Sequence, residues 1–549
     1  MNFLENIFAQ LRVAGDTPVL QRRGERNTVR VSGHELLNMV SKARAFLVTQ
    51  GLKKGDRCAL LANNSIRWVA MDLAIMAEGL IVVPLYARQA PAELVAMMKD
   101  CSPALICCGS DSLAHGIEEN WPDAPPRHLF EDIFETATQV FGAPDLKDTD
   151  AVTIIYTSGT SGNAKGVVLT AGNASFMLGS TSARLDLLMA KQEHEPDRVF
   201  HYLPFCFAGS WIMLLTCLLR RSRLILNTDL NKLADEMRSS EADYFLNVPA
   251  LLERMRKAVD EQLWKAGGLP QAIYSHAKAA WMRKQEGKSK VGDAFWLLQA
   301  RALIFPAIRK KMIGPKLKAL ICGSAPLTLE TQYYFLMLGI PVLQVYGLTE
   351  TTAICTMDDP RHVVPGKVGP AIEGIEMRLG ESDEIVVRGP NIFPGYWNRP
   401  QETAQSLCDG WFHTGDQGEV DAAHNWRIIG RIKNLIILGS GHNVAPEPIE
   451  DKVLQQLPEA QQAVLMGNGR GYLSIIVTGD LTREKVQSAL EQVNRGLPHY
   501  KQIRAFHVNA EPFSIESGLL TANGKLKRDA IAARFNRQVE EMYTVEQAV

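Results

Sequence analysis

The sequence lacks a long uninterrupted apolar run and a basic, apolar leader. Its longest apolar stretch, from Trp68 to Tyr86, is broken by Asp72 and Glu78, so it predicts a buried helix and a following strand instead of a membrane span. The N-terminal residues include Glu5 and have no basic start, which predicts an amphipathic helix and not a signal peptide. We expect a cytoplasmic protein with no transmembrane segment, and we leave peripheral membrane contact open.

Cysteine pairs and an excess of one charge sign are also lacking. The nine cysteines are scattered without a C-x-x-C pair, and no His-x-His spacing occurs, which argues against a zinc site or a disulfide framework. The 59 basic and 60 acidic residues leave a net charge of -1, which argues against a general nucleic-acid binder. A chain of 549 residues exceeds the usual size of one hydrophobic core, so we expect more than one domain.

Hydrophobic periodicity alternates between helix and strand over the first part of the chain. Helical spacing over 32–51, 66–78 and 91–99 is followed each time by a short strand pattern, which predicts α/β layers with largely parallel sheets. From 366 to 429 the pattern changes to β. After a polar stretch at 430–434, about a hundred residues follow an α+β pattern that is long enough for a separate small domain.

Three further stretches have predictions of their own, and the second and third permit two interpretations. Residues 109–150, rich in Asp, Pro and Glu, predict a surface excursion. Residues 251–312 predict a mainly helical segment whose basic middle, from Lys284 to Lys290, is a solvated loop or, less favoured, a membrane-facing patch. The aromatic stretch from Phe205 to Trp211 opens an apolar helix and indicates core packing or an apolar ligand pocket.

A candidate phosphate-binding loop lies between two apolar runs. The stretch from Thr153 to Leu169 reads TIIYTSGTSGNAKGVVL, in which hydroxyl side chains, glycines and Lys165 separate two strand patterns. Backbone N–H groups and a lysine ammonium in such a loop suit a phosphate. The Walker A pattern is absent, because Ala164 stands before the lysine and Gly166 after it. A flexible Gly/Ser connection is the alternative interpretation.

Further candidate residues follow strand patterns. The strand at 317–321 runs into CGSAP and the strand at 342–346 into GLTETT, and ligands of open α/β sheets bind beyond such strand ends. Glu350 there is a candidate Mg²⁺ ligand or a capping residue. Asp416, in HTGD, is a candidate acceptor for ribose hydroxyls or a turn residue. Lys525 lies on a polar turn, where a lysine is usually solvated.

These motifs together resemble a known superfamily. The segments TSGTSGNAKG, YGLTET, HTGD, GRIKN, GHNVAPEPIE and LTANGK occur in the order seen in adenylate-forming enzymes, which include acyl-CoA synthetases, peptide-synthetase adenylation domains and luciferases. The similarity extends over nearly the whole chain. The phrases ICGSAPL and NVAPEPIE look most like the long-chain fatty acyl-CoA synthetase branch.

The resemblance implies a two-step ligase. A carboxylic acid, here a medium- or long-chain fatty acid, would react with Mg²⁺-bound ATP to acyl-AMP and pyrophosphate, and coenzyme A would then displace AMP. It also implies the fold: an N-terminal body over 1–430, with two α/β sheets and a β subdomain, a hinge at 431–434, and a small mobile α+β domain over 435–549.

The resemblance implies roles for individual residues. The ATP-binding set is Thr157, Ser158, Gly159, Thr160, Ser161, Gly162, Lys165, Gly323, Ser324, Ala325, Gln344, Tyr346, Gly347, Thr349, Asp416, Arg431 and Lys525. Within and beside this set, Lys165, Thr349, Glu350 and Lys525 would be catalytic, with Glu350 holding the Mg²⁺. Phe207, Trp211 and Gly323 would line the acid pocket, Gly441 would border the thiol channel, and Lys433 would be the hinge residue.

Two departures and three alternatives accompany this interpretation. Phe207 stands where many acyl-CoA synthetases have histidine, and Asn434 where aspartate is frequent. The first alternative is transfer of the acyl group to the phosphopantetheine arm of an acyl carrier protein. A non-catalytic nucleotide or acyl-ligand sensor is a second alternative, and luciferase-type oxidation is a third. The motifs specify neither the chain length of the acid nor whether it is aliphatic or aromatic.

Overall fold

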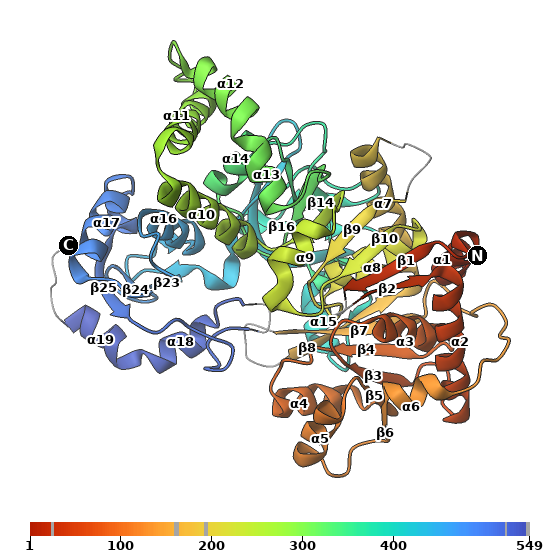
Figure 1. Ribbon diagram of the computed structural model, residues 1–549. Helices are drawn as coiled ribbons and strands as arrows, with labels where there is room; N and C mark the ends of the chain where they lie inside the picture. The colour runs from red at the N-terminus through yellow and green to blue at the C-terminus, as the bar shows by residue number, and fades with distance from the viewer. Residues whose placement is uncertain (24–26, 159–163, 191–195, 522–523, 545–549) are drawn as a thin grey trace.

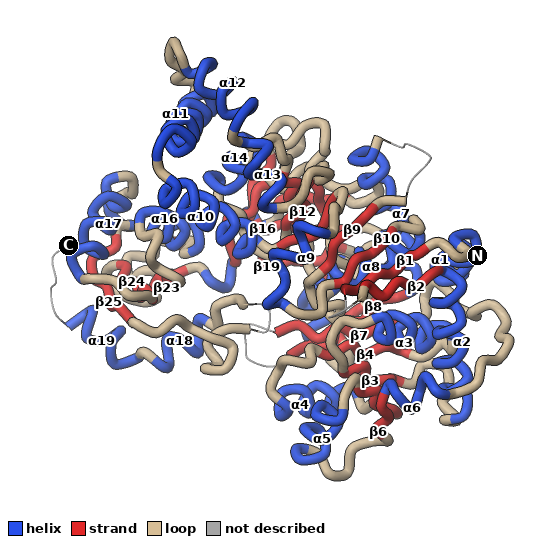
Figure 2. Tube along the Cα trace, viewed as in Figure 1, coloured by secondary structure: helices blue, strands red, loops and turns tan. Residues whose placement is uncertain are grey.

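The computed structural model describes residues 1–23, 27–158, 164–190, 196–521 and 524–544. Two sheets with helices against their faces form the larger N-terminal part, a third sheet adjoins them, and the C-terminal residues form a smaller unit (Figures 1 and 2). This confirms the expected α/β fold class with two sheets, a β subdomain and a separate α+β C-terminal domain.

The first sheet, called here the N-terminal sheet, has the described strand order β17-β8-β7-β4-β3-β5-β6. Strands β3 to β6 run parallel, whereas β7 and β8 form an antiparallel hairpin. The central strands are almost continuously apolar and buried, as parallel strands covered on both faces usually are. The strands are β3 (Arg57–Leu61), β4 (Ile81–Leu85), β5 (Leu105–Cys108), β6 (Arg127–Leu129), β7 (Ala151–Ser158), β8 (Ala164–Thr170) and β17 (Gly395–Tyr396); the helices are α2 (Gly33–Thr49), α3 (Ile66–Ala77), α4 (Pro91–Cys101), α5 (Asp111–Asn120) and α6 (Phe130–Glu135).

The second sheet, called here the central sheet, has the described order β14-β13-β12-β11-β9-β10-β1-β2. Strands β9 to β13 are parallel, so the carboxyl ends of β12 and β13 meet at one edge, where ligands of open α/β sheets bind. The strands are β1 (Pro18–Arg23), β2 (Thr28–Ser32), β9 (Arg198–His201), β10 (Arg223–Leu226), β11 (Tyr244–Asn247), β12 (Ala319–Cys322), β13 (Val342–Tyr346) and β14 (Thr356–Met357); the helices are α1 (Phe3–Ala14), α7 (Ala171–Met189), α8 (Ala208–Leu219), α9 (Leu233–Ser239) and α14 (Leu329–Met337).

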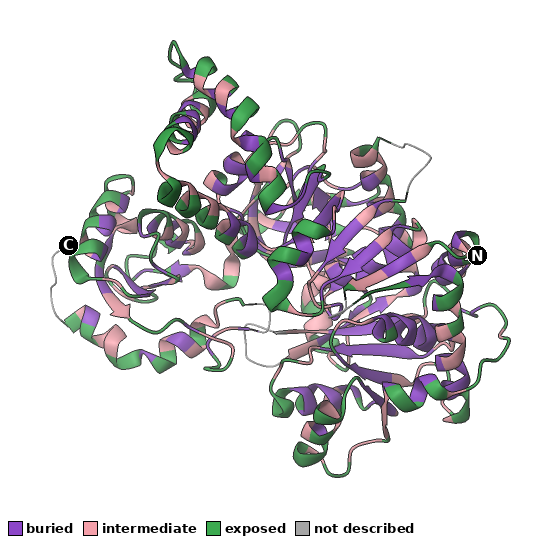
Figure 3. Cartoon of the chain, in the orientation of Figure 1, coloured by how far each residue is buried: buried purple, intermediate pink, exposed green. Residues whose placement is uncertain are grey.

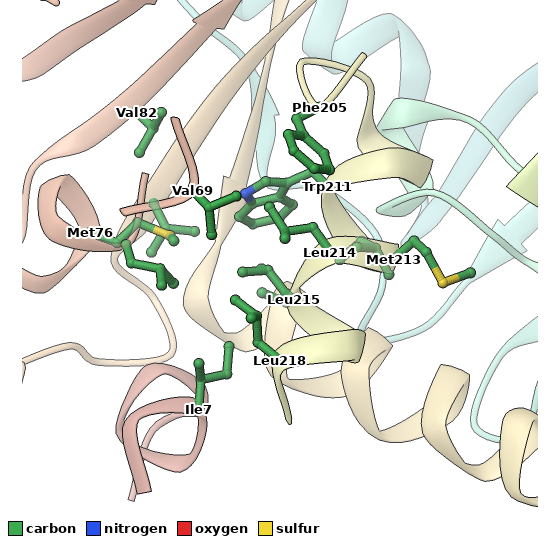
Figure 4. Packing of buried hydrophobic residues seen from close by; sticks show 14 of the residues in the cluster. Ile7, Val69, Met76, Val82, Phe205, Trp211, Met213, Leu214, Leu215 and Leu218 are labelled. Atoms are coloured by element: carbon green, nitrogen blue, oxygen red, sulfur yellow. The ribbon is translucent and has the colours of Figure 1, made fainter. Parts of the chain in front are cut away.

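One hydrophobic cluster joins the two sheets. Trp211 of α8 is fully buried in it, together with Ile7 of α1 and Val69 of α3 (Figure 4). The indole Nε1 of Trp211 donates a 3.1 Å hydrogen bond to Oδ2 of Asp72 on α3. Burial raises the pKa of Asp72 to about 7, although the hydrogen bond from Trp211 acts in the opposite direction. This core therefore contains a carboxyl group that titrates near neutral pH.

The β subdomain has the order β15-β16-β19-β18, and β20 pairs with β19. Along β19 buried and half-buried residues alternate, which is the pattern of a strand with one face on the core. The elements are β15 (Glu376–Leu379), β16 (Glu384–Arg388), α15 (Pro400–Ser406), β18 (Leu407–Cys408), β19 (Trp411–Val420) and β20 (Trp426–Arg431).

The C-terminal domain follows a short 3-10 turn, η4 (Ile432–Asn434), and has its own core. Alternate residues of its sheet, such as Ile475 and Ile476, belong to two separate hydrophobic clusters. Arg528 makes two hydrogen bonds of 2.6 Å to the buried carboxylate of Glu450. The elements are β21 (Ile436–Ile437), β22 (Asn443–Val444), α16 (Glu447–Gln456), β23 (Gln462–Met466), β24 (Leu473–Thr478), α17 (Arg483–Arg495), β25 (Ile503–Asn509), α18 (Arg528–Arg534) and α19 (Asn536–Thr544).

The segment at 251–312 is helical, as expected. It consists of α10 (Pro249–Ala266), α11 (Gly268–Gln285), α12 (Asp293–Leu303) and α13 (Phe305–Met312). Helices α11 and α12 form an antiparallel hairpin that projects from the body (Figure 1). Among the described residues, no helix combines the length and the apolar character needed to cross a membrane.

The stretch at 109–150 was predicted to be a surface excursion, but in the structure it forms part of the N-terminal sheet and its core. It contains α5, β6 and α6, and β6 extends the N-terminal sheet beside β5. Phe130 and Ile133 of α6 are buried, so the stretch contributes to the core. The apolar residues that contribute to the core are few and lie among charged residues. The hydrophobic periodicity of the stretch is therefore weak, and the sequence does not reveal its helices and strand.

We predict that Asp72→Asn changes how stability depends on pH. Because the pKa of Asp72 is raised in the folded protein, its contribution to stability is present at low pH and is lost as the pH rises through about 7. Between about pH 4 and pH 7, wild type should lose up to about 1.4 kcal/mol per pH unit relative to the variant. Calorimetric unfolding over this range measures the difference. Asp123→Asn, at an exposed position, is the control, and parallel wild-type and Asp72→Asn curves would contradict the prediction.

Candidate active site

The predicted phosphate loop lies at the turn of the β7–β8 hairpin. Thr157 pairs with Lys165, and Ser158 pairs with Ala164. The other predicted members of the loop, Gly159, Thr160, Ser161 and Gly162, lie outside the described residues. The Lys165 ammonium lies 5.1 Å from the centre of the Tyr396 ring, a cation–π contact that holds the lysine near the turn.

Glu350 lies at the end of β13, in the 3-10 turn η2 (Thr349–Thr351). Its backbone carbonyl accepts a 2.9 Å hydrogen bond from the amide of Phe393. Its side-chain Oε1 accepts a 2.9 Å hydrogen bond from the Tyr396 hydroxyl. Tyr396 therefore contacts both Lys165 and Glu350 and brings the hairpin and the strand end into one site.

Tyr396 is not among the residues predicted from the sequence for this site. The residue follows a Pro-Gly turn and has no distinguishing local pattern. Its importance arises from β17, which pairs with β8 across more than two hundred residues of chain and so brings Tyr396 to Lys165. No signal in the sequence read alone reports that pairing.

Asp416 is the most buried carboxylate of the candidate site. It lies on β19 opposite Arg431 on β20, and Arg431 Nε approaches Asp416 Oδ1 at 2.7 Å. The Tyr346 hydroxyl donates a 2.7 Å hydrogen bond to Asp416 Oδ2. Burial raises the pKa of Asp416, while Arg431 and Tyr346 act to lower it. Two donors from two sheets thus hold the carboxylate in one orientation.

Two glycines let the ends of β12 and β13 pack closely against neighbouring segments of the chain. A Cβ at Gly323 would lie 2.5 Å from Val345 Cγ2, and a Cβ at Gly347 would lie 2.4 Å from the Ala353 carbonyl oxygen, so neither position accepts a side chain without rearrangement. Ser324 adopts a positive φ of 73°, and Ser324 and Ala325 are exposed beyond β12. The strand ends therefore present backbone and small side chains, which leaves space at this edge for a flat ligand group.

Lys525 reaches this site from the C-terminal domain. Its backbone pairs with Thr521 in a tight turn whose residues 522–523 lie outside the described part of the chain. The side chain is exposed, yet nearby protein atoms partly desolvate its ammonium and lower its pKa; Arg431 lowers it further, whereas Asp416 and Glu350 raise it. Lys525 is therefore electrostatically coupled to the site residues of the body.

Three further predicted site residues differ in how far they are buried and in whether their polar groups are already used. Gln344 is buried, and its Nε2 donates to Gln332 Oε1 at 3.1 Å and to the Lys367 carbonyl at 2.8 Å, so its amide is used within the fold. Trp211 is likewise a core residue, whereas Phe207 is half-buried before α8, with its ring 5.7 Å from that of Tyr86.

The two residues predicted for domain movement are both exposed. Lys433 lies in η4, between the β subdomain and the C-terminal domain. Gly441 lies in the turn between β21 and β22 with a φ of 83°, a conformation that favours glycine. A Cβ at Gly441 would meet no atom within 4 Å, so backbone conformation and not space explains the glycine.

The residues brought together fit a magnesium nucleotide. Asp416 provides a buried, fixed acceptor for hydroxyl groups, Glu350 provides an oxygen ligand of the kind Mg²⁺ prefers, and Lys165 and Lys525 provide positive charge. The glycine-lined strand ends lie at the edge where ligands of such sheets bind.

Comparisons with known proteins agree with this chemistry. The AMP-binding enzyme family matches residues 7–397, and the AMP-binding enzyme C-terminal domain matches residues 433–547. Long-chain-fatty-acid–CoA ligase FadD15 of Mycobacterium tuberculosis is 25% identical over 592 residues, covering 99% of this chain and 97% of that protein. Human long-chain-fatty-acid–CoA ligase 6 is 27% identical over 558 residues, covering 88% and 78% respectively.

Solved structures share the fold. ATP-bound MatB from Rhodopseudomonas palustris is 24% identical, with a TM-score of 0.74 over 97% of this chain and 99% of that one. O-succinylbenzoate coenzyme A synthetase (MenE) from Bacillus subtilis, in complex with AMP, is 19% identical, with a TM-score of 0.75 over 96% and 97%. Since the family match covers well over half of its length, the chain belongs to the AMP-binding enzymes and is an adenylate-forming acid–thiol ligase that uses ATP, Mg²⁺ and coenzyme A.

Proposed function

We propose that this ligase activates a medium- or long-chain fatty acid. The carboxylate of the acid attacks the α-phosphorus of ATP, which forms acyl-AMP and releases pyrophosphate. The thiol of coenzyme A then attacks the acyl carbon, and AMP leaves. The observation that carries the proposal is the electrostatic coupling of Lys525 with Asp416, Arg431 and Glu350, because a cation from the second domain then acts on the residues of the body that we assign to ATP.

The choice of a fatty acid has two supports. Relatives over nearly the whole chain are named long-chain-fatty-acid–CoA ligases, although other acids are named for the solved neighbours. In addition, Phe207 provides an apolar ring, next to Tyr86, at the position where the resemblance suggests the acid pocket. An apolar wall favours an alkyl chain over a charged or hydroxylated acid.

Charge stabilisation is the main task that we assign to the side chains. Asp416 accepts the ribose hydroxyls, and Arg431 and Tyr346 hold it in position. Lys165 and the hairpin turn bind the leaving phosphates, and Lys525 neutralises the charge that develops on the oxygens of the α-phosphate. No side chain acts as a nucleophile, because the substrate carboxylate and the thiol are themselves the nucleophiles.

Glu350 is the residue that we assign to Mg²⁺, with Thr349 beside it. The ion, when bound, neutralises phosphate charge. The hydrogen bond from Tyr396 fixes one carboxylate oxygen of Glu350 and leaves the other to face a ligand. Tyr396 is thus a positioning residue for the metal ligand and, through its ring, for Lys165.

We assign the separation of the two half-reactions to a rotation of residues 435–549 about Lys433. The C-terminal domain touches the body through exposed polar contacts, such as Lys257 Nζ to the Pro458 carbonyl at 2.9 Å and Lys527 Nζ to Glu93 Oε1 at 3.9 Å. Such contacts are weak enough to exchange. In the thioester-forming arrangement, Lys525 withdraws and the turn at Gly441 approaches the thiol channel.

The substrate class is tested by measuring pyrophosphate release with fatty acids of increasing length and with aryl acids. We expect the highest kcat/KM with medium- or long-chain acids, because each buried methylene adds about 0.8 kcal/mol of binding. Preference for an aryl acid or a short dicarboxylic acid would contradict the fatty-acid proposal. A parallel competition between coenzyme A and a phosphopantetheinylated carrier protein identifies the acceptor, and exclusive use of the carrier would contradict acyl-CoA formation.

Lys525→Ala should separate the two half-reactions. We expect acyl-AMP formation to fall by about a hundredfold or more, as for loss of one group that stabilises transition-state charge, while thioester formation from supplied acyl-AMP is preserved. Single-turnover assays of each step provide the measurement. Lys527→Ala, two residues along the same turn, is the matched control and should leave adenylation near wild type. Equal loss in both steps would exclude the assigned role.

Tyr396→Phe should raise the Mg²⁺ concentration needed for half-maximal adenylation by about tenfold, because a hydrogen bond to a charged group is lost while the ring beneath Lys165 stays. ATP–pyrophosphate exchange over a Mg²⁺ titration measures this. Tyr472→Phe removes a 2.8 Å tyrosine hydrogen bond, to the Met542 carbonyl, outside the site and is the control. An unchanged Mg²⁺ dependence in Tyr396→Phe would show that Tyr396 does not position the metal ligand.

A further inference from the structure

The α11–α12 hairpin presents a surface that the ligase chemistry does not use. The two helices pack against each other, with the His276 ring stacked on Trp296 at 4.4 Å and Arg283 paired with Asp293. The hairpin projects away from the body, and much of its outer surface is exposed (Figures 1 and 3). It is therefore an element whose outer face is not covered by any of the residues that the structure describes.

Apolar side chains lie on that outer face. Phe295 and Leu298 are three residues apart on α12, so they share one side of the helix, and they are 55% and 66% exposed. Val291, in the connection just before the helix, is fully exposed. Leu297 and Ala300 of the same helix are buried, which shows that α12 is docked by its inner face and leaves Phe295 and Leu298 outward.

Positive charge surrounds these apolar residues. Between Trp264 and Lys311 the chain has ten lysines and arginines but only two acidic residues. Both acidic side chains are already paired, Glu286 with Lys288 and Asp293 with Arg283. Lys284 and Lys290 form no ion pair with the described residues. The hairpin consequently carries a local excess of positive charge, although the net charge of the whole chain is -1.

The same face continues into a cavity at the base of the hairpin. The cavity has a volume of about 280 Å³, and the residues that line it include Arg301 and Arg309 beside the apolar Phe305 and Leu336. Arg301 is one helical turn from Leu298, so the cavity and the apolar stripe are neighbours. Cationic residues beside apolar residues are complementary to a phospholipid, whose phosphate is anionic and whose acyl chains are apolar.

We propose that the tip of this hairpin docks on the surface of an anionic phospholipid bilayer. The docking surface consists of Lys284, Lys288, Lys290, Val291, Phe295 and Leu298. Its apolar side chains enter the boundary between headgroups and acyl chains, while the lysines keep their ammonium groups at the anionic headgroups. The shape favours a membrane over a protein partner, because the surface is a projecting tip and not a groove. The proposal does not depend on which acid the ligase activates.

Sedimentation with vesicles tests the apolar part of this surface. The full chain should bind vesicles of phosphatidylcholine containing one quarter phosphatidylglycerol, and high salt should weaken the binding. The double variant Phe295→Ser/Leu298→Gln should bind at least about tenfold more weakly, because it removes apolar surface that the bilayer would otherwise bury. Val13→Ser/Val48→Gln changes residues of similar exposure, 64% and 53%, on α1 and α2 away from the hairpin, and should bind as wild type does.

The charged part is tested by reversing Lys284, Lys288 and Lys290 to glutamate. Each lysine lost should weaken binding to the anionic vesicles by about fivefold, with little change for phosphatidylcholine alone. ATP–pyrophosphate exchange and thermal unfolding should stay near wild type in both sets of variants, which separates lost docking from misfolding. Failure of wild type to bind anionic vesicles, or wild-type binding by the variants, would overturn the proposal. Binding of an acidic protein to the tip without vesicle binding would overturn it as well.

Discussion

A buried carboxylate with fixed partners is the constraint on which the site depends. Asp416 is removed from water between Arg431 and Tyr346, and a charge in that position is tolerated only while both partners hold it. Arg431 comes from the neighbouring strand of the β subdomain, whereas Tyr346 comes from the central sheet. Asp416 can therefore contact both partners only when the two sheets pack together correctly. The ribose-binding group that we propose thus depends on correct assembly of the body.

A second polar centre joins the N-terminal sheet to the same edge. Tyr396 connects Lys165 of the β7–β8 hairpin with Glu350 at the end of β13. The groups that we propose for phosphate and metal binding are consequently held on, or directly after, strands of two sheets. The two centres share Lys525, whose pKa responds to Asp416 and to Glu350. Nucleotide binding and closure of the C-terminal domain would then stabilise each other.

The rotation that we propose for the C-terminal domain requires this domain to keep its shape. Its sheet is covered on both faces by its own helices, and the Arg528–Glu450 pair is internal to it. Contacts with the body, by comparison, include a hydrogen bond and an ion pair made by exposed lysines, and water readily replaces such contacts. This difference between a strong interior and a weak interface is what a rotating domain requires. The α11–α12 hairpin belongs to the body and not to the domain that we propose to rotate.

The sequence by itself determined the order of helices and strands, the α/β class and the motifs that supply Lys165, Glu350, Asp416, Arg431 and Lys525, because periodicity and motif chemistry are local properties. The tertiary structure alone decided which other residues join them. Tyr396 reaches the site through pairing of β17 with β8, and β1 extends the central sheet by pairing Leu20 with Leu224. Gln344 and Trp211, predicted as ligand contacts, use their polar groups within the fold. Each of these outcomes depends on contacts between residues far apart in the chain, and such contacts leave no periodic signal in the segments that make them.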